Sequence, residues 1–346
     1  MRYEWGDLIT LEYGKPVSDK GNLNGKYPVF GTNGQIGTSN LPPLCSHPSF
    51  VIGRKGAYRG VHYSDVPFSV IDTAFYVENR SPDLLDMKWA YYKFLTYDIN
   101  HMDSGSAIPS TDRYEIYSIE MDLPPINVQK KIAAILSALD EKIATNRAIN
   151  DNLEQQAFAL FDSLFPRTID GSQTIGDYII PKRGRNLLSK DAVYGAVPVV
   201  AGGLEPSTYH NVANTKAPVL TISASGANAG FVNLWLNPVW SSDSSYIDSS
   251  MTPNVFFWYI LLKGRQKEIF DAQTGSAQPH IYPQHIAAMP IGNLNQESVS
   301  QFTTQVAPLF ELIGANKDEN ERLSNIRDAL LPKLMSGEID VSAVKL

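Results

Sequence analysis

A short basic loop carries the side chains best suited to binding chemistry in this sequence. The loop runs from Gly53 to Gly60 and contains Arg54, Lys55, Tyr58 and Arg59. Guanidinium and ammonium groups donate to phosphate oxygens and to the edge of guanine, and an aromatic ring can stack on a base. The loop is therefore a candidate contact with nucleic acid. The alternative is that its side chains are solvated surface charges and turn residues.

Other basic and polar residues near turns are candidates for the same chemistry, with the same alternative. They are Lys15, Ser110, Arg113, Lys182, Arg183, Arg185, Gln278 and His280.

Patterns that carry catalysis are absent from the sequence. It has no Walker loop, no G-x-S-x-G elbow and no H-E-x-x-H motif, and its six histidines lack metal-ligand spacing. Ser223–Gly230 contains glycines without the G-x-G-x-x-G spacing of a dinucleotide-binding loop, which favours a tight turn. We therefore expect no catalytic residue, no metal site and no cofactor bound to this chain.

The composition indicates a folded chain with an acidic balance. The 346 residues are 43% hydrophobic and 19% charged, which excludes disorder and suggests about two domains. A single cysteine, Cys45, cannot form an internal disulfide or a cysteine-based zinc site, which favours a reducing compartment. The first residues lack a secretory apolar stretch, and the longest apolar run, Val255–Leu262, is too short for a bilayer. We expect a cytoplasmic protein without a membrane partner.

The chain contains an internal duplication: matching residues, such as Gly6 and Gly176, recur at an interval of 170 positions. The interval drifts to 171 at Asp72 and Asp243 and then returns. A repeat of this length has the size of a domain. The predicted segments are mixed α/β domains at 1–125 and 169–295, helical spacers at 126–168 and 296–340, and a C-terminal tail at 341–346.

Each mixed domain has short β-branched or aromatic runs between turn residues, which predict strands. One helix is expected in each, roughly at Pro82–Asp98 and Pro253–Ile269, with a proline near its first turn.

The spacers have apolar residues in alternating steps of four and three. The first seam consists of Ile132, Leu136, Leu139, Ile143, Asn146, Asn150, Leu153, Ala157, Leu160 and Leu164. The second consists of Phe302, Val306, Leu309, Ile313, Asn316, Asn320, Leu323, Arg327, Leu330 and Leu334. This spacing predicts two long helices, the first over Gln129–Leu164, each packed against one partner. Pro308 is expected to kink or delay the second helix.

Four asparagines interrupt the seams. In an antiparallel pair, Asn146 would face Asn320 and Asn150 would face Asn316. A buried polar pair costs stability but specifies register; the alternative is that these amides are solvated at a loose seam. The predicted fold class is α+β: two similar mixed α/β domains joined by two long helices in an antiparallel coiled coil, with pseudo-two-fold duplication. Whether the helices pair within one chain or between two is open, and we assume one chain.

These features together resemble the specificity (S) subunit of type I restriction–modification enzymes over essentially the whole chain. Gly53–Gly56 is similar to the family's R-K-G element, and Gly105–Pro109 followed by Leu123–Ile132 to its domain-to-helix junction. Ile135–Ile143 resembles the start of the first conserved helix, and Leu330–Ile339 the end of the second. The second copy departs from this pattern, with Ser223-Ala224-Ser225-Gly226 in place of the basic loop and no double proline.

The resemblance implies a non-catalytic subunit that gives DNA sequence specificity to a methyltransferase and endonuclease, in defence against foreign DNA. Its two target-recognition domains would read a bipartite, asymmetric site, each with different residues, and the helices would set the gap. The implied partners are double-stranded DNA, two methyltransferase (M) subunits and restriction (R) subunits. S-adenosylmethionine, ATP and Mg would belong to those partners.

Two other functions remain open on sequence alone. One is a methyltransferase with its own target-recognition domain, which binding of S-adenosylmethionine would reveal. The other is a structural or interaction protein whose tandem domains bind glycan or protein on a coiled-coil rod, since aromatic side chains suit sugars as well as bases.

The charge distribution predicts weak DNA binding by the chain alone. The net charge is −7 overall, so few phosphates can be neutralised without a partner. We expect fluorescence anisotropy to detect weak binding at physiological salt, tightening when methyltransferase is added. Strong sequence-specific binding by the isolated chain would refute this expectation.

Overall fold

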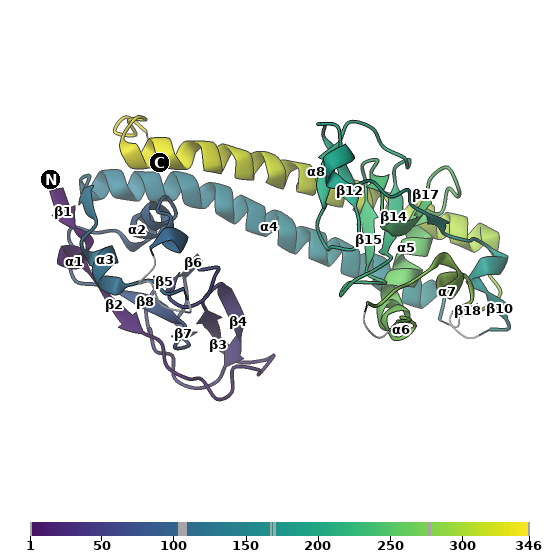
Figure 1. Cartoon of the computed structure of the whole chain (residues 1–346), viewed down its shortest axis with the longest axis horizontal. Coiled ribbons are helices and arrows are strands. Elements are labelled where there is room, and N and C mark those ends of the chain that lie inside the picture. Colours follow the sequence, from purple (N-terminus) through teal and green to yellow (C-terminus); the bar gives the residue numbers. More distant parts are fainter. Residues whose placement is uncertain (1, 103–108, 167, 169–170, 276–277, 345–346) are drawn as a thin grey trace. The chain divides into compact units, whose positions relative to one another are not determined.

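The computed structural model describes residues 2–102, 109–166, 168, 171–275 and 278–344 (Figure 1). Its contacts divide into two compact units: Met1–Ile143 with Glu321–Leu346, and Ala144–Asn320. Each unit combines one mixed α/β domain with one stretch of each long helix. Among the described residues, no helix has both the length and the apolar character needed to cross a membrane.

Two sheets form most of the first domain. One is four-stranded and antiparallel in the order β2-β8-β5-β6; the other is β4-β3-β7, and β1 pairs with β9. The strands are β1 Arg2–Glu4, β2 Ile9–Tyr13, β3 Tyr27–Gly31, β4 Gly34–Ser39, β5 Ser49–Gly53, β6 Val61–Ser64, β7 Ser69–Val70, β8 Ala74–Asn79 and β9 Glu120–Asp122. The helices are α1 Trp5–Leu8, α2 Met87–Phe94, η1 Ile99–His101 and α3 Arg113–Tyr117.

Helix α2 covers the four-stranded sheet through an aromatic core. The ring of Phe94 lies 4.5 Å from that of Trp5 and 5.2 Å from that of Phe50, and all three side chains are buried. The helix is shorter than the predicted Pro82–Asp98. Asp86 caps it by accepting from the backbone N–H of Trp89 at 2.8 Å, and the chain then turns into η1.

The second domain repeats this arrangement. Its sheets are β11-β17-β14-β15 and β13-β12-β16, and β10 pairs with β18. The strands are β10 Gln173–Thr174, β11 Lys182–Arg183, β12 Val197–Val200, β13 Thr208–His210, β14 Val219–Ser223, β15 Val232–Trp235, β16 Trp240–Ser241, β17 Ser244–Asp248 and β18 Pro290–Ile291. The helices are η2 Ile175–Asp177, η3 Ser189–Asp191, α5 Val255–Gly264, α6 Gln266–Asp271 and α7 Pro283–Ala287.

The helix predicted over Pro253–Ile269 is interrupted in the structure. Buried Arg265 separates α5 from α6 and donates to the carbonyl oxygen of Pro290 at 2.7 Å and to Glu268 at 2.7 Å. At the break between α5 and α6, the buried guanidinium of Arg265 thus finds acceptors in both Pro290 and Glu268.

Strand registers confirm the duplication. Val51 pairs with Tyr76 in the first domain and Thr221 with Tyr246 in the second, 170 positions apart on both strands. The drift to 171 is also present. Val29 of β3 pairs with Ser69 of β7, and Val199 of β12 pairs with Trp240 of β16, so the partner strands β7 and β16 are 171 positions apart. One extra residue before β8 restores the interval of 170.

Two long helices, α4 (Ile126–Leu164) and α8 (Gln296–Ser336), pack together as predicted. α4 begins three residues before the predicted start, where the carbonyl of Pro125 accepts from the next turn. α8 continues through Pro308, so the expected delay is wrong. Pro308 lies on the exposed side of the helix while Val306 and Phe310 are buried beside it, and packing therefore holds the helix together. Leu164 is 49% exposed, so the first seam ends before it.

The asparagines of the two seams meet in pairs in the second unit. Asn146 donates to the side-chain oxygen of Asn320 at 2.9 Å, and Asn316 donates to that of Asn150 at 2.8 Å. Asn146 is fully buried and also donates to Glu319 at 2.7 Å. The helices therefore run antiparallel at this point within one chain, and the amides are paired. That they select the register stays a prediction.

The seam in the first unit contains an ion pair at the position where the sequence has Arg327. Its guanidinium lies 2.8 Å from the Asp140 carboxylate, which also accepts from the buried Tyr92 hydroxyl at 2.6 Å. Burial and this hydrogen bond to the carboxylate raise the pKa of Tyr92, so it stays a donor. One carboxylate thus joins both long helices to α2.

Replacing Asn146 tests the buried amide pairs. Asn146→Ala leaves the Asn320 oxygen without its donor, so we expect a loss of about 1–3 kcal/mol in the free energy of unfolding. Urea unfolding followed by circular dichroism measures it. Asn152→Ala, an exposed change on the same helix, is the matched control and should stay within about 0.5 kcal/mol. Equal stability of both variants would contradict the assignment.

Candidate nucleic-acid interface

Backbone hydrogen bonds fix the conformation of the basic loop of the first domain. Gly53 N–H donates to Gly60 at 2.8 Å across its base, and Gly56 N–H donates to Pro109 at 2.9 Å. Gly56 has φ +117°, a conformation that side-chain-bearing residues rarely adopt. The residues after Pro109 run back along the loop, so Thr111 N–H donates to Arg54. The side chains are therefore presented from a rigid backbone.

Two arginines flank one tyrosine beside this loop. The guanidinium carbons of Arg54 and Arg113 lie 4.7 and 5.2 Å from the centre of the Tyr13 ring, which is 44% exposed. Arg54 also donates to the backbone oxygen of Asp72 at 3.0 Å. Tyr13, Arg54 and Arg113, called here the Tyr13 cluster, offer an aromatic face and two cations at one place. This combination suits a phosphate or a base.

The other expected residues of the first domain lie on the basic loop, beside it or directly after β2. Lys55 forms a β-bridge with Ser110, and its ammonium is 3.8 Å from the Asp72 carboxylate. Tyr58 is 73% exposed, and Lys15, exposed as well, follows β2.

Arg59 is a correction to the predicted set. Its side chain is 3% exposed and donates to the carbonyl oxygens of Asn100 and Met102 at 2.6 and 3.1 Å and to Thr111 at 3.1 Å. The expected direct contact with DNA is wrong for Arg59, because the guanidinium is inside the domain. It positions the loop.

The second domain reproduces the same backbone with other side chains. Gly226 N–H donates to Pro279 at 3.1 Å, Ile281 N–H donates to Ala224 at 2.9 Å, and Gly226 has φ +83°. Ser225 bridges His280 as Lys55 bridges Ser110. Each of these positions is 170 residues after its counterpart. The scaffold is thus repeated while the basic pair becomes Ala224 and Ser225.

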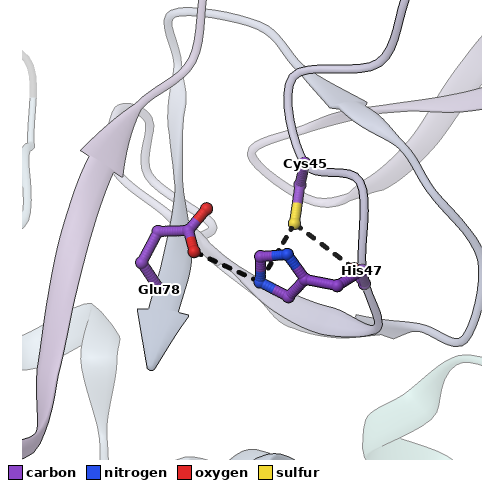
Figure 2. A group of neighbouring side chains, drawn as sticks. All are labelled: Cys45, His47 and Glu78. Atoms are coloured by element: carbon purple, nitrogen blue, oxygen red, sulfur yellow. Dashed lines mark hydrogen bonds and ion pairs between the residues drawn. The ribbon is translucent and has the colours of Figure 1, made fainter. Parts of the chain in front are cut away.

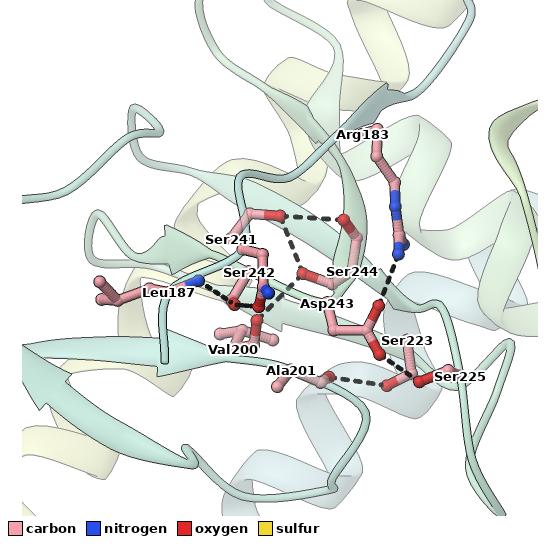
Figure 3. A network of polar contacts seen from close by, with 11 residues as sticks. Arg183, Leu187, Val200, Ala201, Ser223, Ser225, Ser241, Ser242, Asp243 and Ser244 are labelled. Carbon is pink, nitrogen blue, oxygen red and sulfur yellow. Dashed lines mark hydrogen bonds and ion pairs between the residues drawn. The ribbon is translucent and has the colours of Figure 1, made fainter. Parts of the chain in front are cut away.

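An acidic side chain organises this second loop (Figure 3). Asp243 lies between Arg183, 2.5 Å away, and the Ser225 hydroxyl, which donates to it. Serines around it have internal partners; the hydroxyls of Ser241 and Ser244, for example, are 2.8 Å apart. Arg183 is therefore neutralised by a fixed carboxylate, unlike the Tyr13 cluster.

The remaining residues expected in the second domain are more dispersed. His280 stacks on Tyr282 with ring centres 5.9 Å apart, and Gln278 is exposed nearby in the sequence. Lys182 and Arg185 are exposed on either side of Arg183. Residues 104–108 and 276–277 of the Gly-Ser-Ala turns lie outside the described residues.

Tyr13 is not among the residues predicted from the sequence, although its position in the duplication corresponds to that of Arg183, which is. Tyr13-Gly14-Lys15 is the counterpart of Arg183-Gly184-Arg185, 170 positions later. Both glycines follow an edge strand at a close approach: a Cβ on Gly14 would lie 2.0 Å from the Ile71 oxygen. Comparing the copies by position would have placed Tyr13 beside the basic loop.

Sequence spacing also indicated no metal-ligand cluster, yet the fold gathers one within the described residues. Cys45, His47 and Glu78 meet near the end of β8 farther from the Tyr13 cluster (Figure 2). Burial raises the pKa of the Cys45 thiol to about 11.

Comparisons with known proteins agree with this geometry. Residues 2–155 match the family described as type I restriction modification DNA specificity domain. A putative type I specificity subunit from Mycoplasma pneumoniae is 25% identical over 95% of this chain and 94% of its own. The MjaIX type I restriction enzyme specificity subunit from Methanocaldococcus jannaschii is 26% identical over 73% of this chain and 69% of its own.

The fold is also similar to a solved structure. The S subunit of a type I restriction-modification system from M. genitalium superposes with a TM-score of 0.63 at 22% identity, covering 97% of this chain and 96% of that one.

Paired mixed α/β domains on two packed helices, together with the DNA specificity domain matched at residues 2–155, are characteristic of a non-catalytic class of DNA-specificity subunits. Residues 2–155 thus match the specificity-domain family, and the chain as a whole is similar in sequence to specificity (S) subunits of type I restriction–modification systems and shares their fold. In this family the cofactors belong to the M and R subunits.

Arg59 and Arg54 offer a test of positioning against contact within one loop. Arg59→Ala leaves buried carbonyls unpaired, so we expect a loss of about 2–4 kcal/mol in unfolding free energy, and Arg59→Lys, without the planar fork, should recover little. Arg54→Ala removes mainly a partly exposed cation–π contact and should cost about 1 kcal/mol or less. Urea unfolding measures all three variants. Equal losses for Arg54→Ala and Arg59→Ala would contradict the distinction.

Proposed function

We propose that this specificity subunit reads a bipartite, asymmetric DNA target, one half with each domain, while α4 and α8 set the gap between the halves. The observation that carries the proposal is the repeated loop backbone with different side chains. The same hydrogen-bonded frame presents Arg54 and Lys55 in one domain and Ala224 and Ser225 in the other. One geometry with two chemistries is what reading two different half-sites requires.

In this proposal the first domain contacts DNA mainly through the Tyr13 cluster. Arg54 and Arg113 would donate to phosphate or guanine, and the exposed Tyr13 and Tyr58 would pack on sugar or base. Lys15, Lys55 and Ser110 would support these contacts from the rim. Arg59 would act only through the loop that it holds.

The second domain would rely less on charge. The Asp243 carboxylate already neutralises Arg183, which leaves amide, imidazole and exposed basic groups for contacts with DNA. Gln278, His280, Lys182 and Arg185 are the proposed residues, with Arg183 and Asp243 as a fixed donor–acceptor pair. An asparagine or glutamine amide can bond two atoms of adenine, so this half-site need not be guanine-rich.

The helical spacers would dock two methyltransferase subunits, and restriction subunits would join that core. The proposed segments remain recognition domains at 1–125 and 169–295, spacers at 126–168 and 296–340, and a tail at 341–346. The antiparallel pairing supports a spacer role, because two helices packed along a shared seam are stiffer than one and can fix the gap between the half-sites. A cytoplasmic location follows from the DNA target.

Methylome mapping tests the whole proposal. We would co-express the chain with the methyltransferase encoded beside it and map methylated adenines in host DNA. A single split motif, methylated once on each strand and dependent on this chain, is expected. Unchanged methylation, with no co-purification of the two proteins, would refute the role in favour of a structural or interaction protein.

Variants assign the half-sites. Arg54→Ala with Arg113→Ala should relax or weaken recognition of one half-site only, by about 1–3 kcal/mol per base pair read, and Gln278→Ala should affect the other. Lys267→Ala removes an exposed ion pair with Asp271 and serves as the control with an unchanged motif. Changes in both half-sites from either variant would contradict the division of labour.

A further inference from the structure

Three side chains of metal-binding type converge in the first domain (Figure 2). The Nε2 atom of His47 lies 3.2 Å from a carboxylate oxygen of Glu78 and 3.8 Å from the Cys45 sulfur. The ligand atoms of all three residues lie within 4.8 Å of one another. A single imidazole nitrogen therefore faces both the thiol and the carboxylate.

The backbone fixes the positions of these residues. Cys45 exchanges two hydrogen bonds with Phe68, of 3.0 and 2.9 Å, which form an isolated bridge. Glu78 lies on β8, where it pairs with Thr10 of β2. His47 follows Cys45 by two residues in the segment between β4 and β5. The cluster thus joins a connecting segment to the end of β8, an inner strand of the four-stranded sheet.

The spacing of the donors fits a tetrahedral metal ion. Zinc binds thiolate sulfur at about 2.3 Å and imidazole nitrogen or carboxylate oxygen at about 2.0 Å, which places neighbouring ligand atoms roughly 3.3–3.6 Å apart. The observed 3.2 and 3.8 Å fall close to that range. The Cys45 sulfur and the Glu78 carboxylate oxygen also lie within 4.8 Å of each other, so the three donors surround one position.

Charge and exposure also suit a divalent cation. A thiolate and a carboxylate together balance the two positive charges of zinc. Cys45 is buried, whereas the side chains of His47 and Glu78 are 44% and 35% exposed, so an ion can enter from their side. A water molecule can occupy the fourth position from the same side.

We propose that Cys45, His47 and Glu78 form a zinc site with three protein ligands and one water. The proposal is independent of how the chain reads DNA. On binding, the sulfur–zinc bond forms as the S–H bond breaks, and the proton passes to solvent. No oxidant or reductant is needed. The ion ties the segment before β5 to β8 and stabilises the first domain.

The experiment uses the full chain without an affinity tag, treated with a chelator and then titrated with Co²⁺ and Zn²⁺. We expect one Co²⁺ per chain with a thiolate-to-cobalt charge-transfer band. Cys45 is the only cysteine, so this band can report no other residue. Zn²⁺ should displace Co²⁺, abolish the band and raise the melting temperature.

Variants separate this site from incidental surface binding. Cys45→Ser should abolish the band, and His47→Ala and Glu78→Gln should each weaken binding at least about tenfold. Because Cys45 is in the core, the two half-exposed positions carry the test if Cys45→Ser fails to fold. His101→Ala, which removes a histidine ion-paired with Asp98 elsewhere in the domain, is the matched control with unchanged affinity.

Either of two results would overturn the proposal. One is metal binding without a charge-transfer band, and the other is a band whose midpoint is the same in His47→Ala and Glu78→Gln as in the unmodified chain.

Discussion

Each mixed α/β domain is anchored to the long helices by a buried contact, and the placement of its glycine-containing loop, Gly53–Gly60 or Ser223–Gly230, depends on that contact. In the first unit the junction centres on Gln129 of α4, which is completely buried. Its amide donates to the carbonyls of Leu84 and Pro124 at 2.7 and 2.8 Å and accepts from Asp86 N–H at 2.8 Å. Every polar atom of that side chain serves to join the start of α4 to the turn before α2. The Tyr92–Asp140–Arg327 contacts extend the same junction to α8.

In the second unit, mainly apolar contacts attach the mixed α/β domain to the long helices. Val299 occupies the position 170 residues after Gln129, and the rings of Phe256 and Phe310 stack at 4.7 Å between α5 and α8. Tyr259 donates to Glu154 of α4, so both long helices are again held. Domains that share a fold therefore differ in how they are attached as well as in what their loops present.

The burial of the C-terminal residues could not be predicted from a pattern in the sequence. Within the predicted tail at 341–346, Val341 is 2% exposed and packs in the first core, and Lys131 of α4 donates to the Ser342 carbonyl at 2.6 Å. The short described segment Val341–Val344 has no periodicity to signal burial. Arg54 and Arg59 make the same point: five positions apart in one loop, they are equivalent as residue types, but one lies at the surface and the other in the interior.

Spacing that repeats along the chain is sufficient to predict the duplication, the antiparallel helix pair and the pairing of its asparagines. Heptads and a fixed interval of 170 are one-dimensional properties, and the pairing arithmetic follows from them. Packing, in contrast, determines which cations face outward, that Tyr13 lies beside Arg54 and Arg113, and that Cys45 lies beside His47 and Glu78. The contacts of Tyr13 with the two arginines and of His47 with Glu78 join residues from 31 to 100 positions apart, through loops and strand ends whose course depends on packing and has no sequence period.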